Sequence, residues 1–290
     1  VDVGNIDITD QAERAVDRID DDLREAIETA AENIRSFHEK QVPEDWREER
    51  DGLELGRRFR PVGSAGAYVP GGTAAYPSSA LMGVIPAKVA GVGHVVVTTP
   101  PAETLNPATL AAINIAGADA VYQVGGAQAI GALAYGTETV DAVQTVVGPG
   151  NRWVTAAKAE VRGDVTIDFL AGPSEILVVA DGTADPRLVA ADMIAQAEHD
   201  TDAAVTAVTD DEALAREIVA EIEAQLPQRE RGDIIREALA NDASGVLLAR
   251  SMSEAALFAD EYAAEHLSIV AEDEDALLDR IHSAGRSEER

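Results

Sequence analysis

The chain has 290 residues, of which 46% are hydrophobic and 26% charged, and it contains no cysteine. This length suffices for about two domains with buried cores, and the lack of cysteine excludes disulfides, thiolate zinc ligands and a thiol nucleophile. The 23 basic and 53 acidic side chains give a formal net charge of −30. Such a surface repels nucleic acid and anionic membranes, so we expect neither as a partner.

The acidic side chains are spread along the chain, as in Asp20-Asp21-Asp22 and in residues 272–275, and there are only three lysines. Because salt screens the repulsion between such charges, this composition indicates adaptation to high salt, and we expect a halophilic source. No apolar run approaches the length of a membrane span, and no signal peptide opens the chain. We therefore expect a soluble, cytoplasmic protein.

The first third of the chain changes from a helical to a β pattern. Apolar residues spaced by three or four predict one or two amphipathic helices over 10–41, ending before Pro43. Residues 53–61 and 67–69 read as β, and the second strand runs into Pro70-Gly71-Gly72. Such a turn lets the backbone approach a ligand closely, although an ordinary glycine turn explains it as well.

Residues 78–147 alternate between helix and strand. We expect helices over 78–90 and after Asn106-Pro107, and strands at 94–98, 120–124 and 143–147. This alternation predicts a parallel sheet covered by helices on both faces, an α/β fold. Gly125-Gly126 and Gly148-Pro149-Gly150 connect strand to helix, where free amide groups can bind phosphate or ribose. The chain lacks G-x-G-x-x-G, and such turns are usually only tight connections, so the residues alone favour a structural role.

A second strand and helix follow Gly172-Pro173, which predicts a forced turn. The strand spans 176–180, and Asp185-Pro186 begins a helix that ends in Gln196-Ala197-Glu198-His199. Gln196 and His199 are three residues apart, so they share a helix face and can present an amide oxygen and an imidazole nitrogen to a metal. Histidine suits zinc but glutamine is an unusual ligand, and such a pair is more often solvated or caps the helix.

The last third continues the alternation. We expect strands at 203–208, 245–249 and 267–270, helices at 210–225 and 228–240, and a helix opened by Ser251. Glu265-His266 lies where a loop enters the last of these strands. Because adjacent strand residues face opposite sides, both can reach one site only if the backbone is irregular there. A lone Glu-His pair would most often be solvated, and we expect His282 on a helix face.

Several of these segments together resemble the histidinol dehydrogenase family. The resemblance rests on residues 168–175 followed by 196–199, on 68–72, 125–130 and 148–151, and on Glu265-His266-Leu267, and it runs from about residue 60 to residue 285. It implies a member from a halophilic archaeon that oxidises L-histidinol through L-histidinaldehyde to L-histidine with two NAD. These are the last steps of histidine biosynthesis. It also implies a homodimer at full length.

The resemblance also implies the roles of individual residues. The residues that contact NAD are Tyr68, Gln128 and Asn151. Ser174 contacts the substrate, Gln196 and His199 bind both Zn²⁺ and substrate, and Glu265 and His266 form the acid/base pair. His266 would also touch the substrate and take the alcohol proton, while Glu265 would activate the water for the second oxidation.

For the fold, the resemblance implies two interleaved, incomplete Rossmann-like units with parallel sheets. Residues 68–173 would carry the NAD turns, and residues 1–67 together with 174–290 would build the second unit, which carries the substrate and metal residues. We expect the active cleft between the two units, at the carboxyl ends of their strands.

The two ends of the chain depart from the family pattern. The chain begins at Val1, and after Gly285 it lacks the glycine-rich segment in which the family has an aspartate zinc ligand, followed later by a histidine ligand. Two of the four expected zinc ligands therefore have no counterpart. We expect a fragment of the enzyme that is inactive or incomplete by itself, and the alternative is a catalytically dead nucleotide-binding α/β protein.

Overall fold

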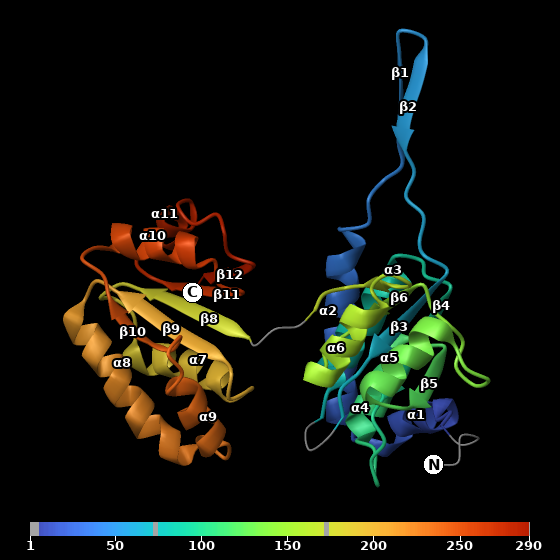
Figure 1. Cartoon of the computed structure of the whole chain (residues 1–290), viewed down its shortest axis with the longest axis horizontal. Coiled ribbons are helices and arrows are strands. Elements are labelled where there is room, and N and C mark those ends of the chain that lie inside the picture. Colours follow the sequence, from blue (N-terminus) through green and yellow to red (C-terminus); the bar gives the residue numbers. More distant parts are fainter. Residues whose placement is uncertain (1–5, 72–74, 171–173, 290) are drawn as a thin grey trace. The chain divides into compact units, whose positions relative to one another are not determined.

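The computed structural model describes residues 6–71, 75–170 and 174–289. The chain divides into two compact units, residues 1–171 and 172–290, and each is described by itself (Figure 1). The predicted turn at Gly172-Pro173 and the glycine at position 72 lie outside the described residues.

The first unit is built on a five-stranded parallel sheet with the order β5-β4-β3-β6-β7. Its strands are β3 (Ser64–Tyr68), β4 (His94–Thr99), β5 (Ala120–Gln123), β6 (Thr145–Val147) and β7 (Thr166–Ile167). One face packs against α1 (Thr9–Ala15), the 3₁₀ turn η2 (Val16–Arg18), α2 (Asp21–Glu39), α3 (Pro77–Val89) and α4 (Pro107–Ala116). The other face packs against α5 (Gly126–Tyr135) and α6 (Arg152–Val161).

The second unit repeats this plan with a sheet of order β10-β9-β8-β11-β12. Its strands are β8 (Glu175–Ala180), β9 (Ala204–Thr209), β10 (Gly245–Leu248), β11 (His266–Val270) and β12 (Arg286–Glu289). One face carries α7 (Pro186–Ala197), α8 (Glu212–Gln225), η3 (Leu226–Gln228) and α9 (Gly232–Leu239), and the other α10 (Met252–Tyr262) and α11 (Glu274–Leu278).

Counted along the chain, both sheets have the strand order 3-2-1-4-5. This is the Rossmann order without its sixth strand. The predicted fold of two incomplete Rossmann-like units with helix-covered parallel sheets is confirmed. The central strands are buried on both faces, since Val95 to Val97 and Leu177 to Val179 are fully buried. Their continuous apolar sequence is typical of such strands.

Residues 1–67 pack in the first unit rather than in the second, where we expected them. The helices α1 and α2 pack against α3 and α4, and Ile27 and Ala31 of α2 belong to the same core as β3 and β4. The strand β3 is itself the central strand of the first sheet. The apolar face of α2 therefore packs against α3 and α4, which follow it in the chain.

Three further segments differ from the predicted pattern. The strands β1 (Trp46–Arg50) and β2 (Leu53–Arg57) form an exposed antiparallel ribbon where we expected one strand over 53–61 (Figure 1). The ribbon turns at Asp51-Gly52, both of which have positive φ, as a two-residue hairpin loop requires. Neither α11 nor β12 was predicted. His282 lies in the loop between them, where its N–H donates to Asp260, and not on a helix face.

The carboxyl edge of the second sheet is closed by Asp181, which follows β8. Its carboxylate accepts hydrogen bonds from the Thr183 N–H and from the Glu272 N–H after β11, both at 2.9 Å. Burial raises the pKa of this carboxyl, but the hydrogen bonds from Thr183 and Glu272 outweigh burial and hold the pKa below its ordinary value. In Rossmann folds, ligands bind in the crevice at this edge of the sheet. Here the carboxylate of Asp181 accepts the hydrogen bonds of these two backbone N–H groups.

We expect Asp181→Asn to destabilise the protein at pH 7 by about 1.5–3 kcal/mol, the range for hydrogen bonds to a charged group. Because the folded-state pKa is depressed, this stabilisation is present above the unfolded pKa, about 3.9, and is lost as the pH falls through the folded pKa. Denaturant unfolding at pH 7 and pH 3 in high salt measures the difference. The exposed Asp242→Asn is the control, and an equal loss from Asp181→Asn at both pH values would contradict the assignment.

Candidate active site

Three of the expected site residues lie at the carboxyl edge of the first sheet. Tyr68 ends β3, Gln128 lies in the first turn of α5 after β5, and Asn151 lies between β6 and α6. β3 and β6 are neighbours at the point where the strand order reverses. This is the switch point at which open α/β sheets bind ligands.

Side chains of the protein already accept hydrogen bonds from some of the free backbone N–H groups at the N-termini of α5 and α6. Tyr68 is only 4% exposed, and its hydroxyl oxygen accepts from the Gly126 N–H at 3.1 Å. Asn151 caps α6, because its Oδ1 accepts from the N–H groups of Trp153 and Val154 at 3.0 and 3.2 Å. The phenolic hydrogen of Tyr68 and the amide NH₂ of Asn151 remain as donors for a ligand, and Gln128 is exposed.

The glycines of these turns have a packing role. Gly148 has a φ of +108°, and a Cβ there would overlap the carbonyl oxygen of Tyr68. A Cβ on Gly125 would lie 2.7 Å from the Cα of Pro100. Both turns therefore need glycine for close backbone contact, whether or not a ligand is bound.

An ion pair between a buried lysine and a partly exposed carboxylate fixes the turn after β6. Lys158 of α6 is 2% exposed, and its Nζ donates to Asp168 Oδ1 at 2.6 Å and to the Gly148 carbonyl at 2.7 Å. The other oxygen of Asp168 accepts from the Gly148 N–H at 2.7 Å. Sequence reasoning missed this pair. The available signal was the position of Lys158 on the buried stripe formed by Val154 and Val161.

The remaining expected site residues lie at the amino edge of the second sheet. Ser174 precedes β8, Gln196 and His199 lie between the last turn of α7 and β9, and Glu265-His266 lies at the start of β11. The expectation that the site lies at the carboxyl ends of the strands was wrong for this unit. These motifs stand before their strands in the sequence, so they meet at the edge where the strands begin.

Three of these residues share one pocket of about 180 Å³. The side chains that line it are Ile176, Asp192, Ala195, Gln196, His199, His266, Leu267 and Ser268. His199 lies beyond the end of α7, but its N–H donates to the Gln196 carbonyl at 3.2 Å and continues the turn. Gln196 and His199 therefore face His266 on β11, whereas Ser174 and Glu265 do not line this pocket.

Glu265 and His266 meet despite being adjacent in the sequence. Glu265 Oε1 lies 3.8 Å from His266 Nε2, and the two side chains are 54% and 33% exposed. The irregular backbone that this requires is present, because Ala263 is left-handed with a φ of +54° and β11 begins only at His266. Glu265 is thus released from strand alternation, and its carboxylate lies beside the imidazole of His266, which lines the pocket.

The described residues do not complete a zinc site. Gln196 and His199 offer two donors, and the described part of the chain contains no group of three His, Cys, Asp or Glu side chains that could hold a metal ion. Zinc normally takes four ligands, or three with one open position. These residues by themselves therefore do not fit a closed zinc centre.

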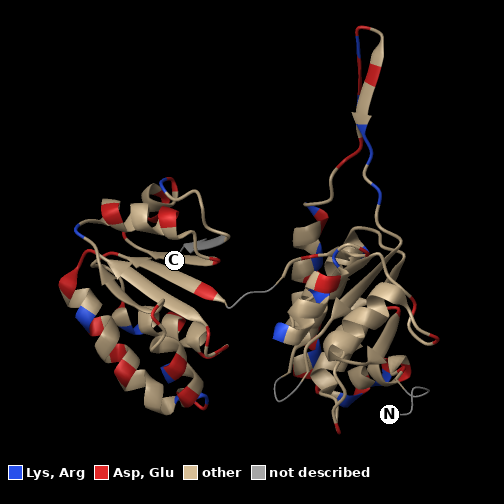
Figure 2. Cartoon of the chain, in the orientation of Figure 1, with Lys and Arg blue, Asp and Glu red and all other residues tan. Residues whose placement is uncertain are grey.

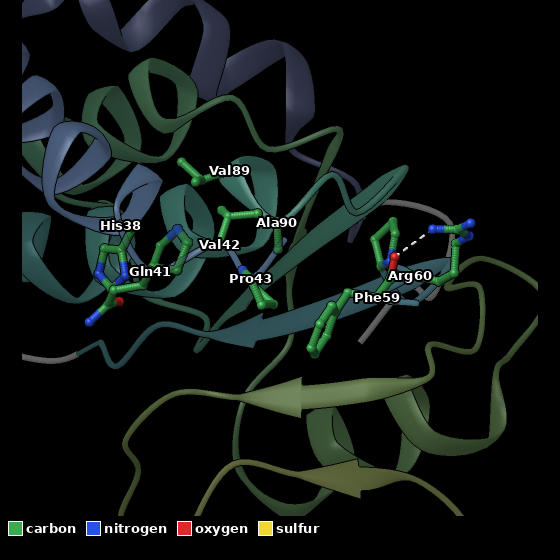
Figure 3. A pocket seen from close by; sticks show the side chains of 10 residues that line it. His38, Gln41, Val42, Pro43, Phe59, Arg60, Val89 and Ala90 are labelled. Atoms are coloured by element: carbon green, nitrogen blue, oxygen red, sulfur yellow. Dashed lines mark hydrogen bonds between the residues drawn. The ribbon is translucent and has the colours of Figure 1, made fainter. Parts of the chain in front are cut away.

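A second hollow lies in the first unit beside the end of α2. It measures about 370 Å³ and is walled mainly by proline, valine and alanine side chains. Figure 3 shows His38 and Gln41 at one end and Arg60 at the other, where Arg60 donates to the carbonyl of Phe59 at 2.8 Å. Its polar groups do not converge, so this groove is not a candidate active site.

The surface matches the composition. Acidic side chains lie on the helices of both units, whereas lysine and arginine are few (Figure 2). None of the helices in the described ranges is long and apolar enough to cross a membrane.

Fold and site together define an α/β protein with two Rossmann-like sheets and a Glu-His pair beside a small pocket. The family model for histidinol dehydrogenase matches residues 2–287. Histidinol dehydrogenases from Haloarcula marismortui and Natronomonas pharaonis are 75% and 73% identical over 98% of this chain and 68% of their own lengths. The chain belongs to the histidinol dehydrogenase family and is an oxidoreductase. Its halophilic relatives support the expected high-salt adaptation.

Solved structures agree with this assignment. The crystal structure of histidinol dehydrogenase from Elizabethkingia anophelis matches with a TM-score of 0.94 and 39% identity, covering 99% of this chain and 67% of that one. The chain thus spans about two thirds of the length of its relatives. An NAD-dependent aldehyde dehydrogenase from Sinorhizobium meliloti matches with a TM-score of 0.59 and 16% identity over 89% of this chain and 66% of that one, which shows a shared fold alone.

Proposed function

We propose that this chain supplies active-site residues for the histidinol dehydrogenase reaction, the NAD-dependent oxidation of L-histidinol through L-histidinaldehyde to L-histidine. The observation that carries the proposal is the convergence of Gln196, His199 and His266 on one pocket with Glu265 3.8 Å from His266. The 75% identity to a histidinol dehydrogenase over 98% of the chain supports it.

The reaction removes two hydrides from one carbon. In the first oxidation the alcohol loses its O–H proton and one hydride and becomes an aldehyde. Water then adds to the aldehyde, and the hydrate loses a second hydride and a further proton to give the carboxylic acid. NAD⁺ supplies the hydride acceptor in both oxidations, so each L-histidinol yields two NADH.

The residues of the pocket suit the proton transfers. His266 is the base that takes the alcohol proton, because a neutral imidazole has a ring nitrogen that can accept it. Glu265, which is more exposed than His266, activates the water for the second oxidation. Ser174 contacts the substrate from the amino edge of β8. The chain would hold NAD through Gln128, the NH₂ of Asn151 and the hydroxyl hydrogen of Tyr68.

Gln196 and His199 are the only zinc ligands proposed among the described residues. They are the expected metal and substrate ligands, but two donors do not make a zinc centre. We therefore derive no catalytic step through the metal, and we propose that the full-length enzyme is a homodimer with a complete ligand set.

In the full-length enzyme we expect Glu265→Gln to lower the rate of aldehyde oxidation by about 10²–10⁴-fold, the usual contribution of general base catalysis, and to spare alcohol oxidation. His266→Asn should impair both. Formation of NADH from L-histidinol and from L-histidinaldehyde in high salt separates the two steps. Equal losses in Glu265→Gln would refute the division of roles. A full-length enzyme that binds NAD but forms no NADH would favour a catalytically dead nucleotide-binding protein.

We expect the purified 290-residue chain to retain much less than one zinc ion after dialysis, because its described residues offer too few ligands. Elemental analysis of the wild type beside His199→Ala measures this. One zinc per chain that is lost in His199→Ala would contradict the expectation and would mean that other oxygen ligands complete the site.

A further inference from the structure

We propose that Ser268 is a further substrate-binding residue, whose hydroxyl pairs with a nitrogen atom of the substrate at the base of the pocket. This inference rests on the proposed function, since it takes L-histidinol as the ligand. No role for this residue follows from the sequence motifs.

The side chain of Ser268 lies on the same face of β11 as the proposed base. Alternation along the strand places His266, Ser268 and Val270 toward α7, whereas Leu267 and Ile269 pack with α10. In register, Ser268 lies beside Val178 of β8, a core residue of the same layer. Ser268 thus places a hydroxyl group on β11 beside an apolar side chain of the core between the sheet and α7.

The hydroxyl of Ser268 is buried and has no hydrogen-bond partner among the residues that the structure describes. Ser268 is 5% exposed. By contrast, the buried Thr206 on β9 donates to the Ala243 carbonyl at 2.8 Å. Buried hydroxyl groups are nearly always paired in folded proteins, and of the two exceptions among the described residues, Thr98 and Ser268, only Ser268 lines this pocket.

The position of Ser268 in the pocket indicates that its hydrogen-bond partner is a bound ligand. Ser268 lines it together with Gln196, His199 and His266, and it is far less exposed than His266, whose side chain is 33% exposed. Ser268 therefore lies deeper than the base. If His266 takes the proton of the alcohol, the remaining polar atoms of L-histidinol are nitrogens. A serine hydroxyl can donate to or accept from any of these nitrogens.

The test measures binding and stability together in Ser268→Ala. We expect the KM and the Kd for L-histidinol to rise about tenfold, the effect of one lost hydrogen bond, with a much smaller change in kcat. Thermal stability in high salt should not fall, because the hydroxyl makes no hydrogen bond to the described residues. Ser268→Thr keeps the hydroxyl and should retain most of the affinity. The control Thr206→Val should lose stability without a change in KM.

The outcomes separate this inference from the proposed function. A wild-type chain that binds L-histidinol while Ser268→Ala binds it equally well overturns the inference and leaves the function intact. A loss of stability in Ser268→Ala without a change in affinity overturns it as well, since the hydroxyl would then be structural. A wild-type chain that does not bind L-histidinol overturns the proposed function itself.

Discussion

The buried contact of Lys158, Asp168 and Gly148 is the constraint on which the first unit depends. Lys158 has 3% of its side chain exposed, and it pairs with a carboxylate whose two oxygens both accept hydrogen bonds. An ammonium buried to this degree is tolerated only when its partners replace the lost hydration. The pair fixes the backbone of Gly148, and with it the turn that carries Asn151 toward the switch point of the sheet. Asp168 also opens the segment that leads to Ser174.

A second lysine in this chain of net charge −30 also forms a partly buried ion pair. Lys88 lies 2.6 Å from Asp119, which also accepts from the Val95 N–H at 2.6 Å. Burial raises the pKa of Asp119, but Lys88 and the backbone donor hold it below its ordinary value. The exposed ion pairs involve arginine and contribute little, particularly in salt. Partly buried pairs keep their strength under the conditions that such an acidic surface indicates.

Short sequence patterns predicted most of the helices and strands, and the segments that were not predicted have physical causes. The strand 176–180 and the helix begun by Asp185-Pro186 follow from apolar runs and capping residues, which act over a few positions. The placement of residues 1–67 depends on which apolar surface α2 meets, which no short pattern specifies. The strand β12 forms only by pairing with β11.

The roles of the expected site residues stay predictions, and the arrangement of these residues in the second unit was not predicted. Ser174 and Glu265-His266 stand before their strands in the sequence, which already implied the amino edge of the sheet, yet the general rule for open α/β sheets pointed to the other edge. The burial of Tyr68 and the capping by Asn151 depend on packing across the sheet. The role of Ser268 could not be predicted, because a serine in a strand carries no motif.

The most direct test of this account is a double-mutant cycle on Lys158→Met and Asp168→Leu, measured as the free energy of unfolding in high salt. Asp168→Leu leaves the buried ammonium of Lys158 without its partner and should lose about 3–5 kcal/mol, whereas Lys158→Met leaves a carboxylate with 18% of its side chain exposed and should lose less. The double variant should lose much less than the sum of the two single losses. Single losses that add to within about 0.5 kcal/mol in the double variant would show that the two residues do not act as a pair, and would contradict the account.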